Sequence, residues 1–162
     1  MRRLLQLIVE WTGRCVAWLV LAMTICMVFV VVRRYVFQLD AIYLQEAVVY
    51  MHALLFMIGL SYAMKHDAHV RVDLLYSRFP PRRKALVNLI GHLAFLVPMS
   101  LVIVAYSFDY VAASWRILEG SQEVGGIPAV YLLKTVIPTA AILLLLQSAV
   151  EIVRCIQDIR RA

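Results

Sequence analysis

Two histidines, His52 and His92, lie inside long apolar stretches. Histidines in such places can ligate haem or form hydrogen bonds between helices. His52 lies 12 residues before Met64 and His92 lies 7 residues after Ala85, where the two stretches border the same polar segment. At a rise of 1.5 Å per residue their depths differ by about 7–8 Å, whereas the two axial ligands of one haem should be nearly level. The spacing favours a hydrogen-bonded histidine over a haem site.

A second group of residues that could bind a metal lies in the polar segment 65–84. It consists of His66, Asp67, His69 and Asp73. The segment holds six of the sixteen Lys and Arg residues, which repel cations, and it lacks a third well-spaced strong ligand. We therefore expect a loop ordered against neighbouring groups and not a metal site.

The remaining motifs of enzyme chemistry are missing from the sequence. The cysteines at 15, 26 and 155 have no paired spacing for zinc or for a disulfide framework. There is no nucleotide-binding glycine loop, nucleophile elbow or Cys-x-x-Cys. The sequence predicts neither a cofactor nor an enzyme.

The composition indicates the class of protein to which these residues belong. Of 162 residues, 64% are hydrophobic and 16% are charged, and the mean hydropathy is +0.84. Soluble domains have about 45–50% apolar and about 25% charged residues. The net charge of +6 comes from basic residues that flank apolar segments, so it indicates membrane orientation and no nucleic-acid partner. We expect a single all-α integral membrane domain.

Four apolar runs are long enough to cross a bilayer, since about 20 residues span its hydrocarbon core. They predict spans at about 15–32, 47–64, 85–108 and 129–150, joined by the segments 33–46, 65–84 and 109–128. Residues 4–11 carry apolar side chains on one helical face. They form either an amphipathic helix in the membrane interface or an extension of the first span.

The basic residues predict the orientation. Twelve of the sixteen Lys and Arg residues lie in the N-terminal segment, the segment 65–84 and the C-terminal tail, which four spans place on one face. The positive-inside rule makes that face cytoplasmic. Both termini are then inside, and the segments 33–46 and 109–128 face outward.

The centres of the four spans carry no Asp, Glu, Lys or Arg. Ion-coupled transporters bind their ions near the bilayer midplane with such groups or with unwound backbone, so a self-contained transporter is disfavoured. The third span carries one partly polar seam, made of Asn88, His92, Phe95, Met99, Val102, Tyr106 and Asp109. We expect this seam to pack on the chain's own helices, with a partner protein as the alternative.

Several segments together resemble the small, DctQ-type permease subunit of tripartite ATP-independent periplasmic (TRAP) transporters. They are RRYVF at 33–37, Glu46 at the start of the second span, HVRVDLLYSRFP at 69–80, SQEVGGIP at 121–128 and IP at 137–138. Many members carry two consecutive acidic residues where this chain has Gln45 and Glu46. That departure weakens any role for a paired carboxylate and leaves Glu46 itself unaffected.

The resemblance implies a three-part uptake system in a bacterial inner membrane. A periplasmic solute-binding protein captures an organic acid, often a carboxylate, and a large permease subunit moves it with sodium. The small subunit lies in the phospholipid bilayer, supports the large one and helps dock the binding protein. A haem-binding membrane anchor of a redox complex and an orphan four-span scaffold are the alternative functions.

The resemblance also suggests which residues face partners. The candidates on the outer side are Arg34, Glu46, Glu119, Ser121, Glu123, Gly126 and Pro128. In the cytoplasmic segment, His69, Arg71 and Asp73 are expected to hold the loop against the helix ends. The alternative for each is anchoring at the membrane interface or a turn satisfied by its own chain.

Overall fold

The computed structural model describes residues 2–66, 76 and 79–161. Its helices are α1 (Arg2–Val36), α2 (Ile42–Lys65), α4 (Pro81–Gly91), α5 (Val97–Arg116) and α6 (Val130–Arg161). A short π-helical segment, His92–Leu96, joins α4 to α5, so residues 81–116 form one long helix. The described residues contain no strand, and four helices are long and apolar enough to cross a membrane. The expected all-α membrane fold is confirmed.

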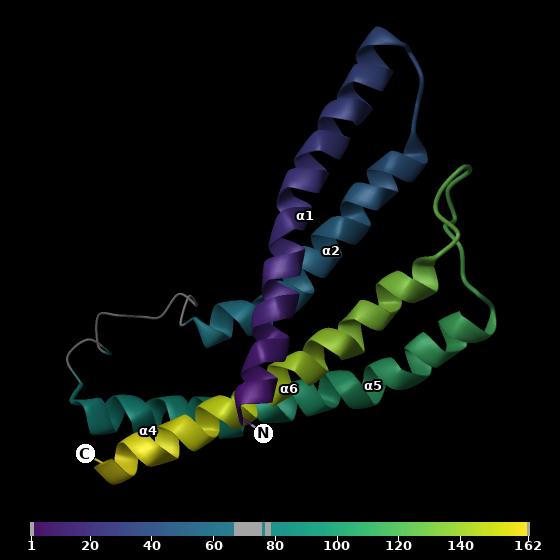
Figure 1. Cartoon of the computed structure of the whole chain (residues 1–162). Helices are drawn as coiled ribbons and strands as arrows, with labels where there is room; N and C mark the ends of the chain where they lie inside the picture. The colour runs from purple at the N-terminus through teal and green to yellow at the C-terminus, as the bar shows by residue number, and fades with distance from the viewer. Residues whose placement is uncertain (1, 67–75, 77–78, 162) are drawn as a thin grey trace.

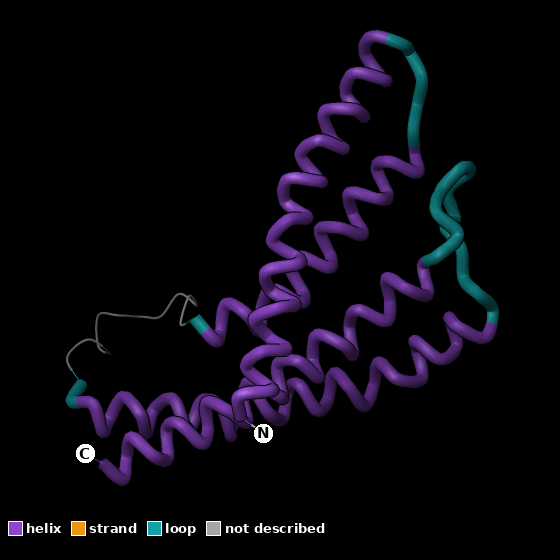
Figure 2. Tube along the Cα trace, in the orientation of Figure 1, coloured by secondary structure: helices purple, strands orange, loops and turns teal. Residues whose placement is uncertain are grey.

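Two helical hairpins cross and then diverge (Figure 1). The first consists of α1 and α2, and the second of the long α4–α5 helix and α6. The turns of both hairpins lie toward one end of the molecule, and the two termini lie toward the other (Figure 2). Helix α6 joins the hairpins, since it packs against α4 and α5 of its own hairpin and against α2 of the other.

Residues 2–14 continue α1 without a break. Of the two alternatives for the N-terminal segment, the structure therefore has the extension of the first span. The reason lies in the polar side chains of this segment. Glu10 pairs with Arg14 one turn later, at 2.8 Å between Arg14 Nε and Glu10 Oε1, and also with Lys65 of α2. The charged side chains of Glu10 and Arg14 are thus paired within a helix that continues into the span.

The π-helical segment lies one turn before Pro98. Proline has no backbone N–H, and its ring collides with the carbonyl four residues earlier in an α-helix. In the structure the N–H of Val97 instead donates to the carbonyl of His92, five residues earlier. The wider turn accommodates the proline without ending the helix, as π-bulges commonly do.

Helix α5 packs through small residues. The serines at 100, 107 and 114 recur every seven residues and are buried together with Val111. In α6 the buried face includes Ala140, Ala141 and Ser148. Small side chains let two helix backbones approach closely, and this packing drives association where lipid is as apolar as leucine.

The seam predicted to pack on the chain's own helices is largely exposed, which corrects that expectation. Phe95 is 73%, Met99 61% and Tyr106 81% exposed, and Val102 and Asp109 are exposed as well. Near its start the seam does meet the chain itself: Asn88 donates to the hydroxyl of Tyr76 at 2.9 Å, and His92 approaches Ser148. The serine face lies inward instead, because large aromatic side chains would hold α5 and α6 apart.

Candidate functional site

The loop between α5 and α6, residues 117–129, is fastened to the start of α2 by Glu46. One carboxylate oxygen of Glu46 accepts a hydrogen bond from the Ser121 hydroxyl. The other accepts the backbone N–H of Ile127 at 2.5 Å. Glu46 thus joins the two hairpins at the end where they diverge.

Gly126 leaves the room that this contact needs. A Cβ placed on Gly126 would lie 2.7 Å from Glu46 Oε1 and still closer to the Ser121 hydroxyl. The neighbouring Gly125 has a φ of +81°, in the left-handed region that glycine adopts without strain. The two glycines therefore have separate reasons to be glycine, one steric and one conformational.

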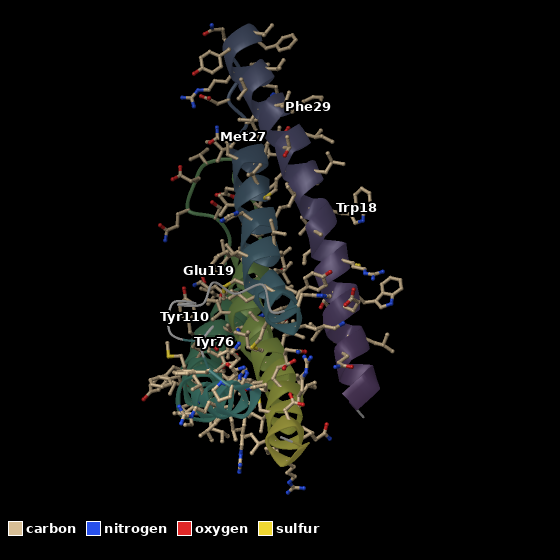
Figure 3. The ribbon with its side chains drawn as sticks, turned by 90° about the vertical axis from the view of Figure 1, so that its left-hand side faces the viewer. Trp18, Met27, Phe29, Tyr76, Tyr110 and Glu119 are labelled. Carbon is tan, nitrogen blue, oxygen red and sulfur yellow. The ribbon has the colours of Figure 1, made fainter. Side chains whose placement is uncertain are left out.

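A second carboxylate, Glu119, fastens the other side of the loop to its own hairpin. Glu119 Oε2 accepts hydrogen bonds from Lys134 Nζ of α6 at 2.5 Å and from the Ser114 hydroxyl of α5 at 2.7 Å. The ammonium of Lys134 also lies 4.2 Å from the centre of the Tyr110 ring. These groups lie on one side of the molecule, where Figure 3 labels Glu119 and Tyr110.

The ion pair of Glu119 has an electrostatic consequence. Hydrogen bonding from Lys134, with a smaller contribution from Ser114, lowers the pKa of the Glu119 carboxyl. A lowered carboxyl pKa stabilises the fold above the ordinary pKa, and this contribution is lost as the pH falls through the lowered pKa. The pair is therefore fully formed at neutral pH.

Trp115 and Tyr131 brace the same region from the two helices. Their rings meet edge to face with centroids 4.6 Å apart, and Trp115 Nε1 donates to the Thr135 hydroxyl at 2.8 Å. Trp115 and Tyr131 were not among the predicted site residues. The available signal was their position in the terminal turns of the two helices that flank a glycine-containing loop.

The remaining outer candidates are exposed. Glu123 and Pro128 lie on the surface of the loop, and Val124 at its tip is 92% exposed. Arg34 lies on the other hairpin, where Arg34 Nε is 3.9 Å from Asp40 Oδ1 and both side chains are open to solvent. The structure thus brings Glu46, Ser121 and Gly126 together, and it leaves Arg34 apart from them.

The residues predicted to order the segment 65–84, His69, Arg71 and Asp73, lie outside the described residues. What the structure adds at that end is a cluster around Glu10. Its carboxylate pairs with Lys65 and lies 3.2 Å from His66 Nε2.

The first hairpin is also fastened by a close approach of its two helices. One turn along α1 from Glu10, Gly13 lies directly against the Tyr62 ring, so that an added Cβ would overlap it. The amphipathic pattern of residues 4–11 marked this segment, but nothing in it pointed to α2.

The two histidines within the spans have different surroundings. His92 Nδ1 lies 3.4 Å from the Ser148 hydroxyl of α6, which agrees with the expected hydrogen bond between helices. His52 is exposed on α2 and stacks on Phe56, with ring centroids 6.3 Å apart. Among the described residues no group of three or more His, Cys, Asp or Glu side chains could hold a metal ion.

The carboxylates of Glu46 and Glu119 accept their hydrogen bonds from the chain itself. Such groups fix geometry, because their lone pairs are already engaged by donors. Four membrane-length helices with uncharged centres, capped at one end by a fastened loop, define a multi-pass helical membrane protein.

The family model described as the DctQ component of tripartite ATP-independent periplasmic transporters matches residues 23–158. The chain therefore belongs to this family and is the small permease subunit of a TRAP transporter, a system that also contains a large permease and a periplasmic binding protein. A search among curated proteins found no match.

Proposed function

We propose that this chain is the scaffold subunit of an uptake system in the bacterial inner membrane. It holds the large permease subunit in the bilayer and helps dock the periplasmic solute-binding protein. The solute is an organic acid that crosses with sodium through the large subunit.

One observation carries the proposal: the loop 117–129 is fastened to both hairpins through Glu46 and Glu119. A loop held at two points loses little further conformational freedom on binding a partner, and this preorganisation strengthens association. The fastening leaves Glu123 and Val124 facing outward. The arrangement suits a surface that receives another protein.

The uncharged helix centres support the division of labour between the subunits. Sodium needs oxygen ligands or charged groups along its path. The acidic and basic residues of the described helices lie toward their ends, as Glu46, Lys65, Asp109 and Lys134 do. That distribution supports the proposal that the large subunit couples transport to sodium and that this chain has a supporting role.

The experiment is co-purification from membranes that express the complete transporter. With an affinity tag on this chain, a large multi-span permease should remain bound through purification in mild detergent. Purification of this chain without any large permease would contradict the proposal. A Soret absorption band in the purified protein would instead favour a haem-binding anchor.

A further inference from the structure

An open groove runs along the first hairpin between α1 and α2. It has a volume of about 560 Å³. Its walls are mainly apolar side chains of α1, among them Met27 and Val28, together with Val48 and His52 of α2. The one other polar side chain in its lining, Thr24, already donates its hydroxyl to the Val20 carbonyl at 2.9 Å. Met27, Val28 and Val31 are about half exposed.

His52 is unusual in this position. It lies 10 residues from the start of α2 at Ile42 and 13 residues from its end at Lys65. At 1.5 Å per residue these intervals are about 15 Å and about 20 Å, so the residue lies close to the middle of a bilayer about 30 Å thick. The imidazole is too short to reach either water boundary from there.

The imidazole of His52 meets no hydrogen-bond partner in the described part of the chain. A polar group that faces hydrocarbon without a partner is costly, which is why such groups in spans usually pair with another helix. An acyl chain in the groove would leave the imidazole unsatisfied. A helix that carries a hydroxyl, an amide or an accessible backbone carbonyl at the same depth would satisfy it.

The outward face of α5 and of the π-helical segment before it provides the contrast. Phe95 and Met99 are more exposed than the groove residues, but they are apolar and need no hydrogen-bond partner. Tyr106 lies two residues from the end of the uncharged run 85–108 and three residues before Asp109, so its hydroxyl is close to the membrane interface. Lipid can cover this face without leaving a buried polar group unpaired. In the groove, lipid would leave the His52 imidazole without a hydrogen-bond partner.

We infer that the α1–α2 groove receives a transmembrane helix of the large permease subunit, with His52 hydrogen-bonded to a polar group of that helix. The inference rests on the proposed function, and it names the surface of this chain that contacts the large permease. The methionine and valine walls supply the packing, since methionine adapts its shape to an irregular neighbour. The imidazole fixes the depth at which the two subunits engage.

Photocrosslinking tests which surface meets the partner. In membranes that contain the whole transporter, Val28 is replaced by p-benzoylphenylalanine, and Phe95 of the π-helical segment is replaced in the same way as the matched control. Irradiation should join the large permease to the chain from position 28 and not from position 95. Adducts from position 95 alone, adducts with lipid alone, or adducts with a second copy of this chain would each overturn the inference.

Substitution at His52 tests the hydrogen bond. His52→Leu should lower the amount of large permease retained on a tagged chain by about three- to tenfold, the size expected of one hydrogen bond between spans. His52→Gln should retain it, and Tyr106→Leu on the other face should have no effect. Retention of the permease by His52→Leu at the unmodified level would overturn the role of His52.

These outcomes separate the inference from the proposal beneath it. If the unmodified chain retains the large permease while crosslinks from the groove reach only lipid, the scaffold function stands and the assignment of the surface is wrong. If the unmodified chain retains no permease, both fail.

Discussion

Glu46 and Ile127 are 81 positions apart in the sequence, yet the backbone N–H of Ile127 donates to Glu46 Oε2 at 2.5 Å. The contact joins the N-terminal part of α2 to the loop between α5 and α6, across the space where the hairpins diverge (Figure 1). Because the Ser121 hydroxyl bonds to the second carboxylate oxygen, one side chain holds the loop at two points. The proposed docking role depends on this fastening.

Removing the Glu46 carboxylate should impair uptake more than removing a carboxylate elsewhere. Glu46→Ala frees both Ser121 and Ile127, whereas Asp158→Ala alters an exposed residue near the end of α6. We expect a several-fold lower initial rate for Glu46→Ala and an unchanged rate for Asp158→Ala, at matched membrane abundance. Equal rates for the two variants would refute this ranking.

The contact of Gly13 with Tyr62 should make the first hairpin intolerant of a single methyl group. An added Cβ at Gly13 would overlap the Tyr62 ring, whereas the same atom at Gly59 meets nothing within 4 Å. Gly13→Ala should lower the free energy of unfolding by about 1–3 kcal/mol, as overpacking does. Gly59→Ala should leave it unchanged or raise it by up to about 1 kcal/mol.

The measurement for this pair is unfolding by sodium dodecyl sulphate in mixed micelles. Truncation of the neighbour in Gly13→Ala/Tyr62→Ala should recover part of the loss, since it makes room for the methyl group. Equal stability of Gly13→Ala and Gly59→Ala would contradict the close approach of α1 and α2.

The serine face of α5 should respond to substitution as a packed interface. Ser107 is 8% exposed and Met99 is 61% exposed on the same helix. Ser107→Leu should destabilise the chain by about 1–3 kcal/mol because the larger side chain forces α5 from its neighbour. Met99→Leu should have little effect. The reverse order, measured by the same unfolding assay, would restore the original expectation for the seam.

The distribution of basic residues predicts which positions can be labelled from outside the cell. In a chain without its native cysteines, Val124→Cys in the outer loop should react with an impermeant maleimide on intact spheroplasts. Arg82→Cys, at the start of α4, should react only after the membrane is permeabilised. Both positions are exposed in the structure, so accessibility to water alone does not separate them. Labelling of Arg82→Cys from outside would contradict the proposed orientation.

Composition and run length were sufficient to predict four membrane helices, because the hydrophobic thickness of a bilayer sets their length directly. They could not predict where the helices end. The pairing of Glu10 with Lys65 and of Glu119 with Lys134 lets α1 and α6 carry charged residues inside helical turns. Hydropathy alone counts such residues as breaks.

The inward face of α5 was predicted wrongly for a physical reason. Aromatic and methionine side chains such as Phe95 and Met99 indicate a core in a soluble protein, where burial from water drives packing. Inside a bilayer that drive is absent, and close approach through Ser100 and Ser107 decides which face packs. The contacts of Glu46 could not be predicted from a single sequence either, because no local sequence pattern connects Glu46 to a loop so distant along the chain.

The central claim is that this chain supports transport and provides no pathway of its own. The direct measurement is sodium-driven solute accumulation in proteoliposomes supplied with the periplasmic binding protein. Vesicles that contain this chain together with the large permease should accumulate solute, and vesicles that contain this chain alone should accumulate none. Accumulation by this chain alone would contradict the account.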